Sequence, residues 1–501
     1  MYLSKSKYTS GIQCPKMLWM RQNMPEQFDD SVMNEAILQQ GSAVGDIAMG
    51  YYGPFVEVRF DPKDPDRFSK AVQQTKDFLD QSCPIICEAA FRISGHYCMA
   101  DILRVRDDGS FDLVEVKSST EVKPICLHDM AYQCWVIQQC GYKVRSASLM
   151  HVNSEYVRHG ELDLQGLFTA EDCSDEVLAM AAGVLSRVER ILSVADSKEE
   201  PEVPIGEHCY KPYDCGFRKW CFRDLPSPNT LELSRIRKSK AFSLIERGLA
   251  GFDELAEDAG AFSALSAKQQ LQVLSVVNDI PVSIDKDGIS DFLDGLWYPL
   301  YFLDFETFQE AIPSFDNQRP YEQVTSQYSL HWITEPGGEL HHAEFLGEAG
   351  TDPRRQAAEH LCEDIPPDAC VLAWNMGFEK GRISEMASLF PDLAERLLAI
   401  RDNARDLMTP FVRGHYYMKE MEGSASIKKV LPALFPNDAE LDYHALDGVH
   451  NGGEAAFAFQ HLAELPPQEQ EITREQLLRY CELDTLAMVR IWEKLVEEVS
   501  L

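Results

Sequence analysis

Asp101, Glu115 and Lys117 have the types and the spacing that hydrolysis of a phosphodiester needs. Asp101 lies in a strand-like run at residues 98–106, and Glu115-Val116-Lys117 ends the next such run. Because side chains alternate along a strand, Glu115 and Lys117 project from one face. The carboxylates would hold a divalent cation that activates water, and the lysine would orient that water or stabilise negative charge. A hairpin with exposed charges would show the same pattern.

Asp304, Glu306, Glu379, Tyr480 and Asp484 form a second group of this kind. Asp304 and Glu306 end an apolar strand and share a face, while Tyr480 and Asp484 are four residues apart and therefore neighbours on a helix. Glu379 follows a predicted turn from strand to helix. Four carboxylates brought together would hold two divalent cations, Mg²⁺ or Mn²⁺, about 4 Å apart, and Tyr480 would orient the attacking water.

Four of the 14 cysteines form a third group: Cys14, Cys209, Cys215 and Cys221. The last three are separated by five residues each, and the other ten cysteines lie in apolar segments, where a free thiol packs as a small hydrophobe. Four thiolates can hold one [4Fe-4S] cluster that ties the N-terminus to residues 209–221. Zinc, with His208 as a spare ligand, is the alternative, although zinc modules usually space their cysteines two to four residues apart.

Two α/β units separated by a helical segment are expected to position these groups. The first is predicted from helices at 34–52, 67–81, 127–140 and 176–193 and strands at 85–93, 98–106, 111–116 and 145–151. Residues 201–224 have no regular period, and residues 234–279 have a helical one. The second unit is predicted from strands at 296–305, 327–333 and 371–374 and helices within 474–495. The expected domains are therefore 1–224, a helical connector at 225–295, and 296–501.

The composition is that of an ordinary globular protein, with 45% hydrophobic and 26% charged residues among 501. The sequence has no apolar run of about 18 residues and no secretion signal, so we expect a cytoplasmic protein with no membrane partner. The formal net charge of −34 excludes a uniformly basic nucleic-acid coat and argues against tight, salt-resistant binding. Metal ions at the acidic groups would offset part of this charge. A basic cluster at 235–240 is either a solvated helix start or a phosphate contact.

The first group lies in a wider pattern that resembles the RecB-like branch of the PD-(D/E)XK nucleases. Glu88 precedes the strand of Asp101, Glu115 and Lys117 follow, and Gln133 comes on the next helix. The resemblance implies that Glu88, Asp101 and Glu115 bind metal, that Lys117 is catalytic, and that Gln133 lies at the site. The family often has an upstream metal-binding histidine that this chain lacks. Either Asp46 substitutes for it or one metal ligand is absent.

One cysteine before this fold and three after it resemble the iron-sulfur nucleases related to RecB, including the CRISPR-associated adaptation nucleases. The second group resembles the DnaQ-like (DEDD) exonucleases of the ribonuclease H-like fold, in the tyrosine subclass. Glu379 stands where that family usually has Asp, and Asp406 is a candidate replacement. The combination resembles, over nearly the whole chain, a bacterial family described as a domain of unknown function.

These resemblances imply a phosphodiester hydrolase with two candidate sites, a RecB-like DNA nuclease and a DnaQ-like 3′–5′ exonuclease. The expected partner is nucleic acid, DNA in preference to RNA, in processing, repair or defence against mobile DNA; no protein partner is indicated. Two alternatives remain open. In one, only the C-terminal site is active, on RNA or short oligonucleotides, and the N-terminal domain binds. In the other, the protein binds nucleic acid or senses redox state through its iron-sulfur cluster, without nuclease activity.

Overall fold

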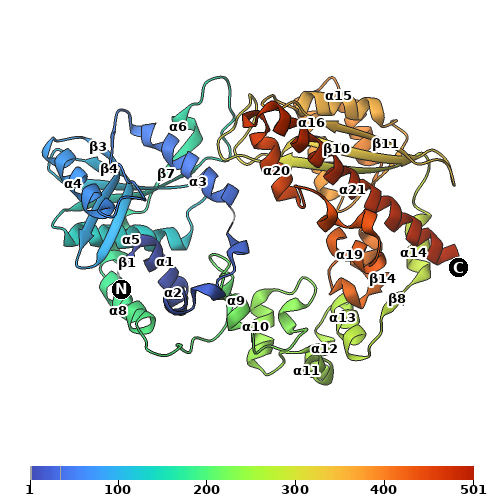
Figure 1. The fold of residues 1–501 in the computed structure, drawn as a ribbon, viewed down its shortest axis with the longest axis horizontal. Coiled ribbons are helices and arrows are strands. Elements are labelled where there is room, and N and C mark those ends of the chain that lie inside the picture. Colours follow the sequence, from blue (N-terminus) through green and yellow to red (C-terminus); the bar gives the residue numbers. More distant parts are fainter. Residues whose placement is uncertain (1–2, 34, 501) are drawn as a thin grey trace. The chain divides into compact units, whose positions relative to one another are not determined.

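The computed structural model describes residues 3–33 and 35–500. The chain forms two compact units: residues 1–224 with 310–321, and residues 225–309 with 322–501. Residues 225–295, which the sequence sets apart as a connector, cluster with the second unit, and residues 310–321 cluster with the first. Both units are mixed α/β structures (Figure 1). Among the described residues, no helix is long and apolar enough to span a membrane.

The first unit is built on a seven-stranded sheet in the order β2-β3-β4-β5-β6-β7, with β1 paired to β4. The strands are β1 (Leu3–Ser4), β2 (Val56–Glu57), β3 (Ile85–Ile93), β4 (His96–Val105), β5 (Phe111–Lys117), β6 (Val144–Val152) and β7 (Phe168–Asp172). β3, β4 and β5 are antiparallel, and β5 pairs parallel to β6 after the crossover helix α5 (Pro124–Gln139). The first six residues of β5 are buried, as expected for a central strand that is covered on both faces.

Helices cover both faces of this sheet. One face packs against α1 (Lys5–Gln13), α4 (Arg67–Asp80), α5, α7 (Ser174–Ala181) and α8 (Val184–Ala195). The other packs against α3 (Glu35–Ala48), α6 (Leu164–Leu167) and Ala311 of the 310–321 segment. The remaining helices are α2 (Pro15–Asn23) and α9 (Arg218–Cys221). The single helix predicted at 176–193 is interrupted and forms α7 and α8, and β7 has no counterpart among the predicted strands.

The second unit contains a five-stranded sheet in the order β11-β10-β9-β12-β13. The strands are β9 (Leu300–Phe308), β10 (Val324–Ile333), β11 (His341–Leu346), β12 (Cys370–Ala373) and β13 (Ala404–Asp406). β9, β10 and β11 are antiparallel, and β12 runs parallel to both β9 and β13. β8 (Val282–Ile284) and β14 (Tyr416–Met418) form a separate two-stranded antiparallel sheet.

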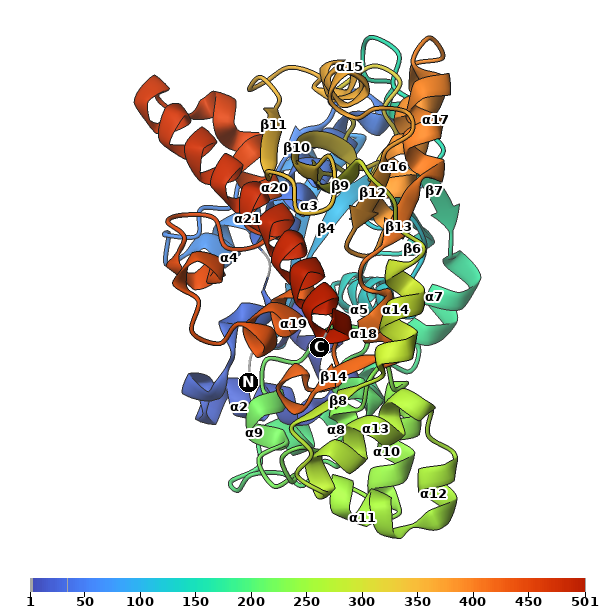
Figure 2. The same cartoon turned by 90° about the vertical axis from the view of Figure 1, so that its right-hand side faces the viewer.

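The apolar face of the second sheet packs against α15 (Arg354–Asp364), α16 (Gly377–Leu389) and α17 (Ala394–Asp402). Figure 2 shows α21 (Pro467–Ser500) as one continuous helix on the other side of the strands. There the ring of Trp492 lies 5.8 Å from that of Phe302 on β9. The other helices are α10 (Lys238–Glu246), α11 (Phe252–Glu257), α12 (Ala259–Ser263), α13 (Ala267–Val277), α14 (Lys286–Leu293), α18 (Thr409–Arg413), α19 (Ile427–Leu434) and α20 (Gly452–His461).

Candidate active sites and cysteine cluster

Carboxylates of Asp304, Glu306 and Asp484 meet between β9 and α21, and their oxygens all lie within 4.8 Å of one another. The alternation along β9 explains this arrangement, because Leu303 and Phe305 pack into the core on one face and leave Asp304 and Glu306 on the other. α21 covers that second face and brings Asp484 to it. The structure therefore brings Asp304 and Glu306 of the strand together with Asp484 of the helix α21.

Burial and mutual repulsion raise the pKa values of these carboxyl groups. Burial and then Asp484 raise the pKa of Glu306 to about 8, and burial, Asp484 and Glu306 raise that of Asp304 well above its ordinary value. Burial also raises the pKa of Asp484 to about 6, although hydrogen bonds from Tyr443 and Tyr480 oppose it. Carboxylates that are buried together and resist ionisation are suited to binding cations, which compensate their charge.

Glu379 lies in the first turn of α16 and is buried. Burial and the nearby Asp406 raise its pKa to about 8, and Glu379 in turn raises the pKa of Asp304. One buried oxygen of Glu379, Oε2, has no hydrogen-bond partner among the described residues. Asp406 accepts hydrogen bonds at Oδ1 from the backbone N–H groups of Asn375 and Met408, both 3.0 Å. Glu379 thus has an oxygen to offer a cation, whereas Asp406 shapes the loop.

Tyr480 lies at the same site, with its ring 6.1 Å from that of Tyr443 and 5.8 Å from the Lys428 ammonium. Tyr443 donates a 2.5 Å hydrogen bond to Asp484. Burial and then the charge of Asp484 raise the pKa of Tyr480, so its hydroxyl stays protonated. The sequence reasoning did not single out Lys428 or Tyr443 as site residues. No pattern in the sequence marked Tyr443.

The first unit brings Asp101, Glu115, Lys117 and Gln133 together on the sheet face covered by α1 and α5. Lys117 Nζ lies 2.5 Å from Glu115 Oε1, and Gln133 donates to Glu115 Oε2 at 2.6 Å. Asp101 Oδ2 accepts from the backbone N–H of Val116 at 2.7 Å. Glu115 is fully buried, so these contacts replace the water that its charge would otherwise require.

Two further residues, which sequence reasoning missed, complete this cluster. Lys5, at the start of α1, places its ammonium 3.0 Å from Asp101 Oδ1 and 3.1 Å from Glu115 Oε1. Asp129, one turn before Gln133 on α5, pairs with Lys117 at 3.0 Å. Burial acts to raise the pKa of Glu115, but Lys117 and Lys5 outweigh it and hold that pKa below its ordinary value. Lys5 could not have been found from spacing, because it lies 96 residues before Asp101.

Glu88 lies on β3 between Cys87 and Ala89, which pair with Ile102 and Ala100 on either side of Asp101, and its backbone is in the left-handed region with φ of 54°. A non-glycine residue rarely adopts this conformation, and functional sites are where it concentrates. Burial and then Asp101 raise the pKa of Glu88 to about 7. Asp46 is not placed with this group. It is exposed on α3, whose buried Val44 and Ala48 pack on the opposite face of the sheet from Glu115.

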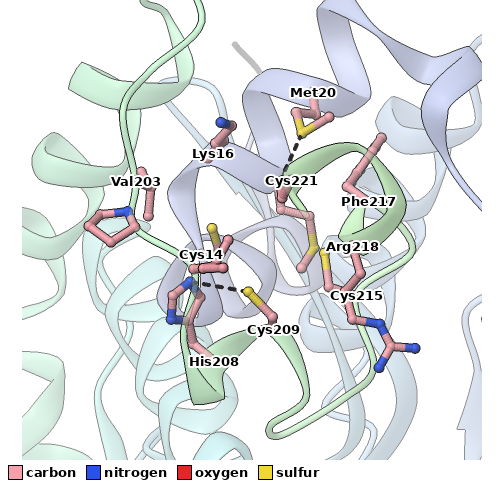
Figure 3. A pocket seen from close by; sticks show the side chains of 13 residues that line it. Cys14, Lys16, Met20, Val203, His208, Cys209, Cys215, Phe217, Arg218 and Cys221 are labelled. Atoms are coloured by element: carbon pink, nitrogen blue, oxygen red, sulfur yellow. Dashed lines mark hydrogen bonds between the residues drawn. The ribbon is translucent and has the colours of Figure 1, made fainter. Parts of the chain in front are cut away.

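The four cysteines Cys14, Cys209, Cys215 and Cys221 line one pocket, with Lys16, Met20 and His208 among its other walls (Figure 3). Cys14 separates α1 from α2, and the other three come from a segment with little regular structure. His208 Nε2 lies 3.7 Å from Cys209 Sγ. Gln13 donates to the carbonyls of His208 and Tyr213 at 2.8 and 2.7 Å, which fixes the end of α1 against this segment.

Burial raises the pKa values of all four thiols, and that of Cys209 reaches about 11. Their charges also affect one another: Cys14, Cys215 and Cys221 each raise the pKa of Cys209. Four thiols in one pocket that resist ionisation without a cation form a donor set that fits an iron-sulfur cluster or zinc.

Comparison with known proteins adds one match. No curated protein matches the chain. A protein-family model does match part of the chain, residues 301–426. This segment begins in β9 and ends just before α19, so it contains Asp304, Glu306 and Glu379 and excludes Tyr480 and Asp484. Residues 301–426 are similar to the family whose model is described as Domain of unknown function (DUF2779).

Proposed function

We propose that the protein is a metal-dependent nuclease with a DnaQ-like 3′–5′ exonuclease site in its second unit and a RecB-like DNA nuclease site in its first. The observation that carries the proposal is the convergence of half-buried Asp304 and Glu306 with buried Asp484, each of which places one carboxylate oxygen within 4.8 Å of the others. Mg²⁺ and Mn²⁺ prefer oxygen donors of this kind. The unpartnered Oε2 of Glu379 would supply a fourth carboxylate ligand. The substrate is nucleic acid, with DNA favoured over RNA.

At the second-unit site, Asp304, Glu306, Glu379 and Asp484 would hold Mg²⁺ or Mn²⁺. When bound, such ions polarise the scissile phosphate and lower the pKa of water. The protein's own groups do the rest. Tyr480 keeps its proton and can orient the attacking water through its hydroxyl. Lys428 lies over the rings of Tyr443 and Tyr480, where its charge can meet a phosphate. Tyr443 holds the Asp484 carboxylate in place through its 2.5 Å hydrogen bond.

At the first-unit site, Lys117 is the group that would stabilise charge developing on the phosphate. Glu88, Asp101 and Glu115 would hold the metal, and Gln133 orients Glu115. The four cysteines would hold a [4Fe-4S] cluster, or zinc, that fixes α1 to residues 209–221. The cluster in this scheme is structural, and the chemistry belongs to the carboxylates.

One observation favours a second candidate function, in which the first unit binds nucleic acid without cutting it. The Lys5 ammonium lies 3.0–3.1 Å from the two carboxylates that would hold the metal, so it already compensates their charge. A divalent cation would have to displace it. In that case hydrolysis belongs to the second unit alone, on RNA or short oligonucleotides as well as DNA.

Degradation of end-labelled single-stranded DNA and RNA with Mn²⁺ or Mg²⁺ tests both candidates. The wild type is compared with Asp304→Ala, Lys117→Ala and, as a control, Asp253→Ala, an exposed acid on α11. Loss of a separate product pattern in each of the first two variants supports two working sites. Loss in Asp304→Ala alone supports the binding role of the first unit. Unchanged degradation in Asp304→Ala, or no cleavage by the wild type, contradicts the proposal.

A further inference from the structure

A second group of metal-ligand side chains lies on the edge of the second sheet, apart from the four acids. His331 on β10, His342 on β11 and Glu482 on α21 each offer a ligand atom, and these atoms all lie within 4.8 Å of one another. The two histidines face each other directly across the antiparallel pair, with ring centroids 4.5 Å apart. Glu482 approaches from the helix that crosses these strands. Three separate elements thus deliver ligands to one point.

The hydroxyls around His331 fix the direction in which its ring points. Thr485 Oγ1 donates to the backbone carbonyl of Glu482 at 3.0 Å, and His331 Nδ1 lies 2.8 Å from Thr485 Oγ1. Because the Thr485 hydroxyl donates its proton to the Glu482 carbonyl, its oxygen accepts a hydrogen bond from His331 Nδ1–H. The lone pair of the His331 ring is then on Nε2. A hydrogen bond of this kind to one ring nitrogen is what orients a metal-binding histidine through the other.

Ser329 extends the same support to the second histidine. Its hydroxyl lies 2.7 Å from Thr485 Oγ1 and 3.1 Å from His342 Nε2. His331 is buried, Glu482 is half-buried and His342 is exposed, so the group is closed on the protein side and open to solvent on the other. The charge of Arg490 lowers the pKa of His331, and Arg490 itself pairs with Glu493 at 3.0 Å. Glu482 is the carboxylate that offers a ligand atom, and Glu344 on β11 interacts electrostatically with both His342 and Glu482.

We propose that His331, His342 and Glu482 form a binding site for a transition-metal ion of the zinc class, with Thr485 and Ser329 orienting the two imidazoles. Two imidazoles and one carboxylate are a donor set that suits Zn²⁺, whose ligands lie about 2.0–2.2 Å from the ion. The set is poorly matched to Mg²⁺, which prefers oxygen ligands alone. The ion would tie α21 to β10 and β11 beside the turn that carries Tyr480 and Asp484, and would leave one position open to solvent.

Calorimetric titration of Zn²⁺ into the full-length protein tests this site. The titration is made on protein whose cysteine site is already loaded and with millimolar Mg²⁺ present, so that the cysteine site and the two acidic sites do not take up the zinc. We expect one equivalent to bind the wild type. His342→Ala and Glu482→Gln should each weaken that binding at least tenfold. His341→Ala is the matched control, because His341 precedes His342 on β11 but packs beside Trp332 on the other face of the strand.

Cobalt substitution supplies a second readout that does not depend on activity. Co²⁺ bound to imidazole and carboxylate gives visible bands without the thiolate charge-transfer band that the cysteine site would give. These bands should appear in the wild type, His341→Ala and Asp304→Ala, and disappear in His342→Ala. The proposal is overturned if no zinc equivalent binds the wild type, if His341→Ala loses the equivalent as His342→Ala does, or if the bound cobalt carries the thiolate band. Circular dichroism confirms that each variant is folded.

Discussion

The two clusters of acids differ in how their charge is compensated. In the first unit, Lys5 and Lys117 approach Glu115 at 3.1 and 2.5 Å, and the pKa of Glu115 falls below its ordinary value. In the second, Asp304, Glu306 and Asp484 lie together, and the pKa of Glu306 rises to about 8. The charge of Glu115 is therefore stabilised by the protein's own cations, whereas the acids of the second cluster need cations from solution. Similar carboxylates can thus have opposite effects on the metal-free fold.

The largest expected effect comes from neutralising one acid in each cluster. Glu115→Gln leaves Lys5 and Lys117 without their shared partner, and breaking a buried ion pair typically costs about 3–5 kcal/mol. Glu306→Gln instead removes repulsion, so the metal-free protein should become more stable while metal-dependent degradation falls by about 10²–10³-fold. Chemical denaturation without divalent ions measures the stability of both variants. The end-label assay measures the fall in metal-dependent degradation. If both variants shift stability in the same direction, the contrast between the clusters is wrong.

The next effect separates the two units through the cysteine cluster. Cys14 follows α1, the helix that begins with Lys5, so losing the cluster should loosen α1 and move Lys5 away from Asp101 and Glu115. We expect Cys215→Ser to lose its bound iron or zinc and to lower the unfolding temperature of the first unit. Cleavage that depends on Asp304 should be unchanged. Cys173→Ser, a half-buried cysteine outside the pocket, is the control, and metal analysis with the end-label assay gives the readouts.

A tenfold effect is expected at Lys5 itself. In a Glu306→Gln background, which weakens the second site, Lys5→Ala should bind Mn²⁺ at least tenfold more tightly, because the cation no longer competes with an ammonium. Lys7→Ala, an exposed lysine on the same helix, should not change the affinity. Titration followed by electron paramagnetic resonance measures free Mn²⁺. Equal affinities for the two variants would mean that Lys5 does not occupy the cation position.

Local patterns in the sequence predict most of the strands and the acids that they carry. The alternation in β5 and β9 places Glu115 with Lys117, and Asp304 with Glu306, as the spacing predicts. What spacing does not contain is the approach of distant elements. Lys5 reaches its acids from a helix at the start of the chain, and Tyr443 reaches Asp484 from a short 3₁₀ turn. Such contacts depend on packing, which a single sequence does not report.

The same limit explains the misplaced residues. Asp46 was a candidate because of its place in the chain, but the apolar residues of α3 direct that helix to the opposite face of the sheet. Residues 310–321 join the first unit through contacts such as the 2.7 Å hydrogen bond from Arg158 to the carbonyl of Pro313. His331 and His342 become a pair only through the register of β10 and β11.

The smallest expected effect is a pH dependence that has one sign at Glu306 and Glu379 in the second unit and the opposite sign at Glu115 in the first. Glu306 and Glu379 have pKa values of about 8 in the fold against an ordinary value of 4.5, so between these values the folded state binds more protons than the unfolded one. The stability of the metal-free second unit should therefore fall as pH rises from 4.5 to 8. Glu115, whose pKa is lowered, should instead lose its stabilising contribution as pH falls below 4.5.

Bound Mn²⁺ should cancel the fall in stability of the second unit between pH 4.5 and 8, because the cation favours the ionised form of these carboxylates. The rise in unfolding temperature on adding Mn²⁺ should therefore be larger at pH 8 than at pH 5.5, by a few degrees. Differential scanning fluorimetry at the two pH values measures this difference. Glu306→Gln should reduce it, since that variant has one fewer acid to ionise, whereas Asp253→Asn should keep it. A stabilisation that is equal at both pH values would show that Mn²⁺ binds elsewhere than at these carboxylates.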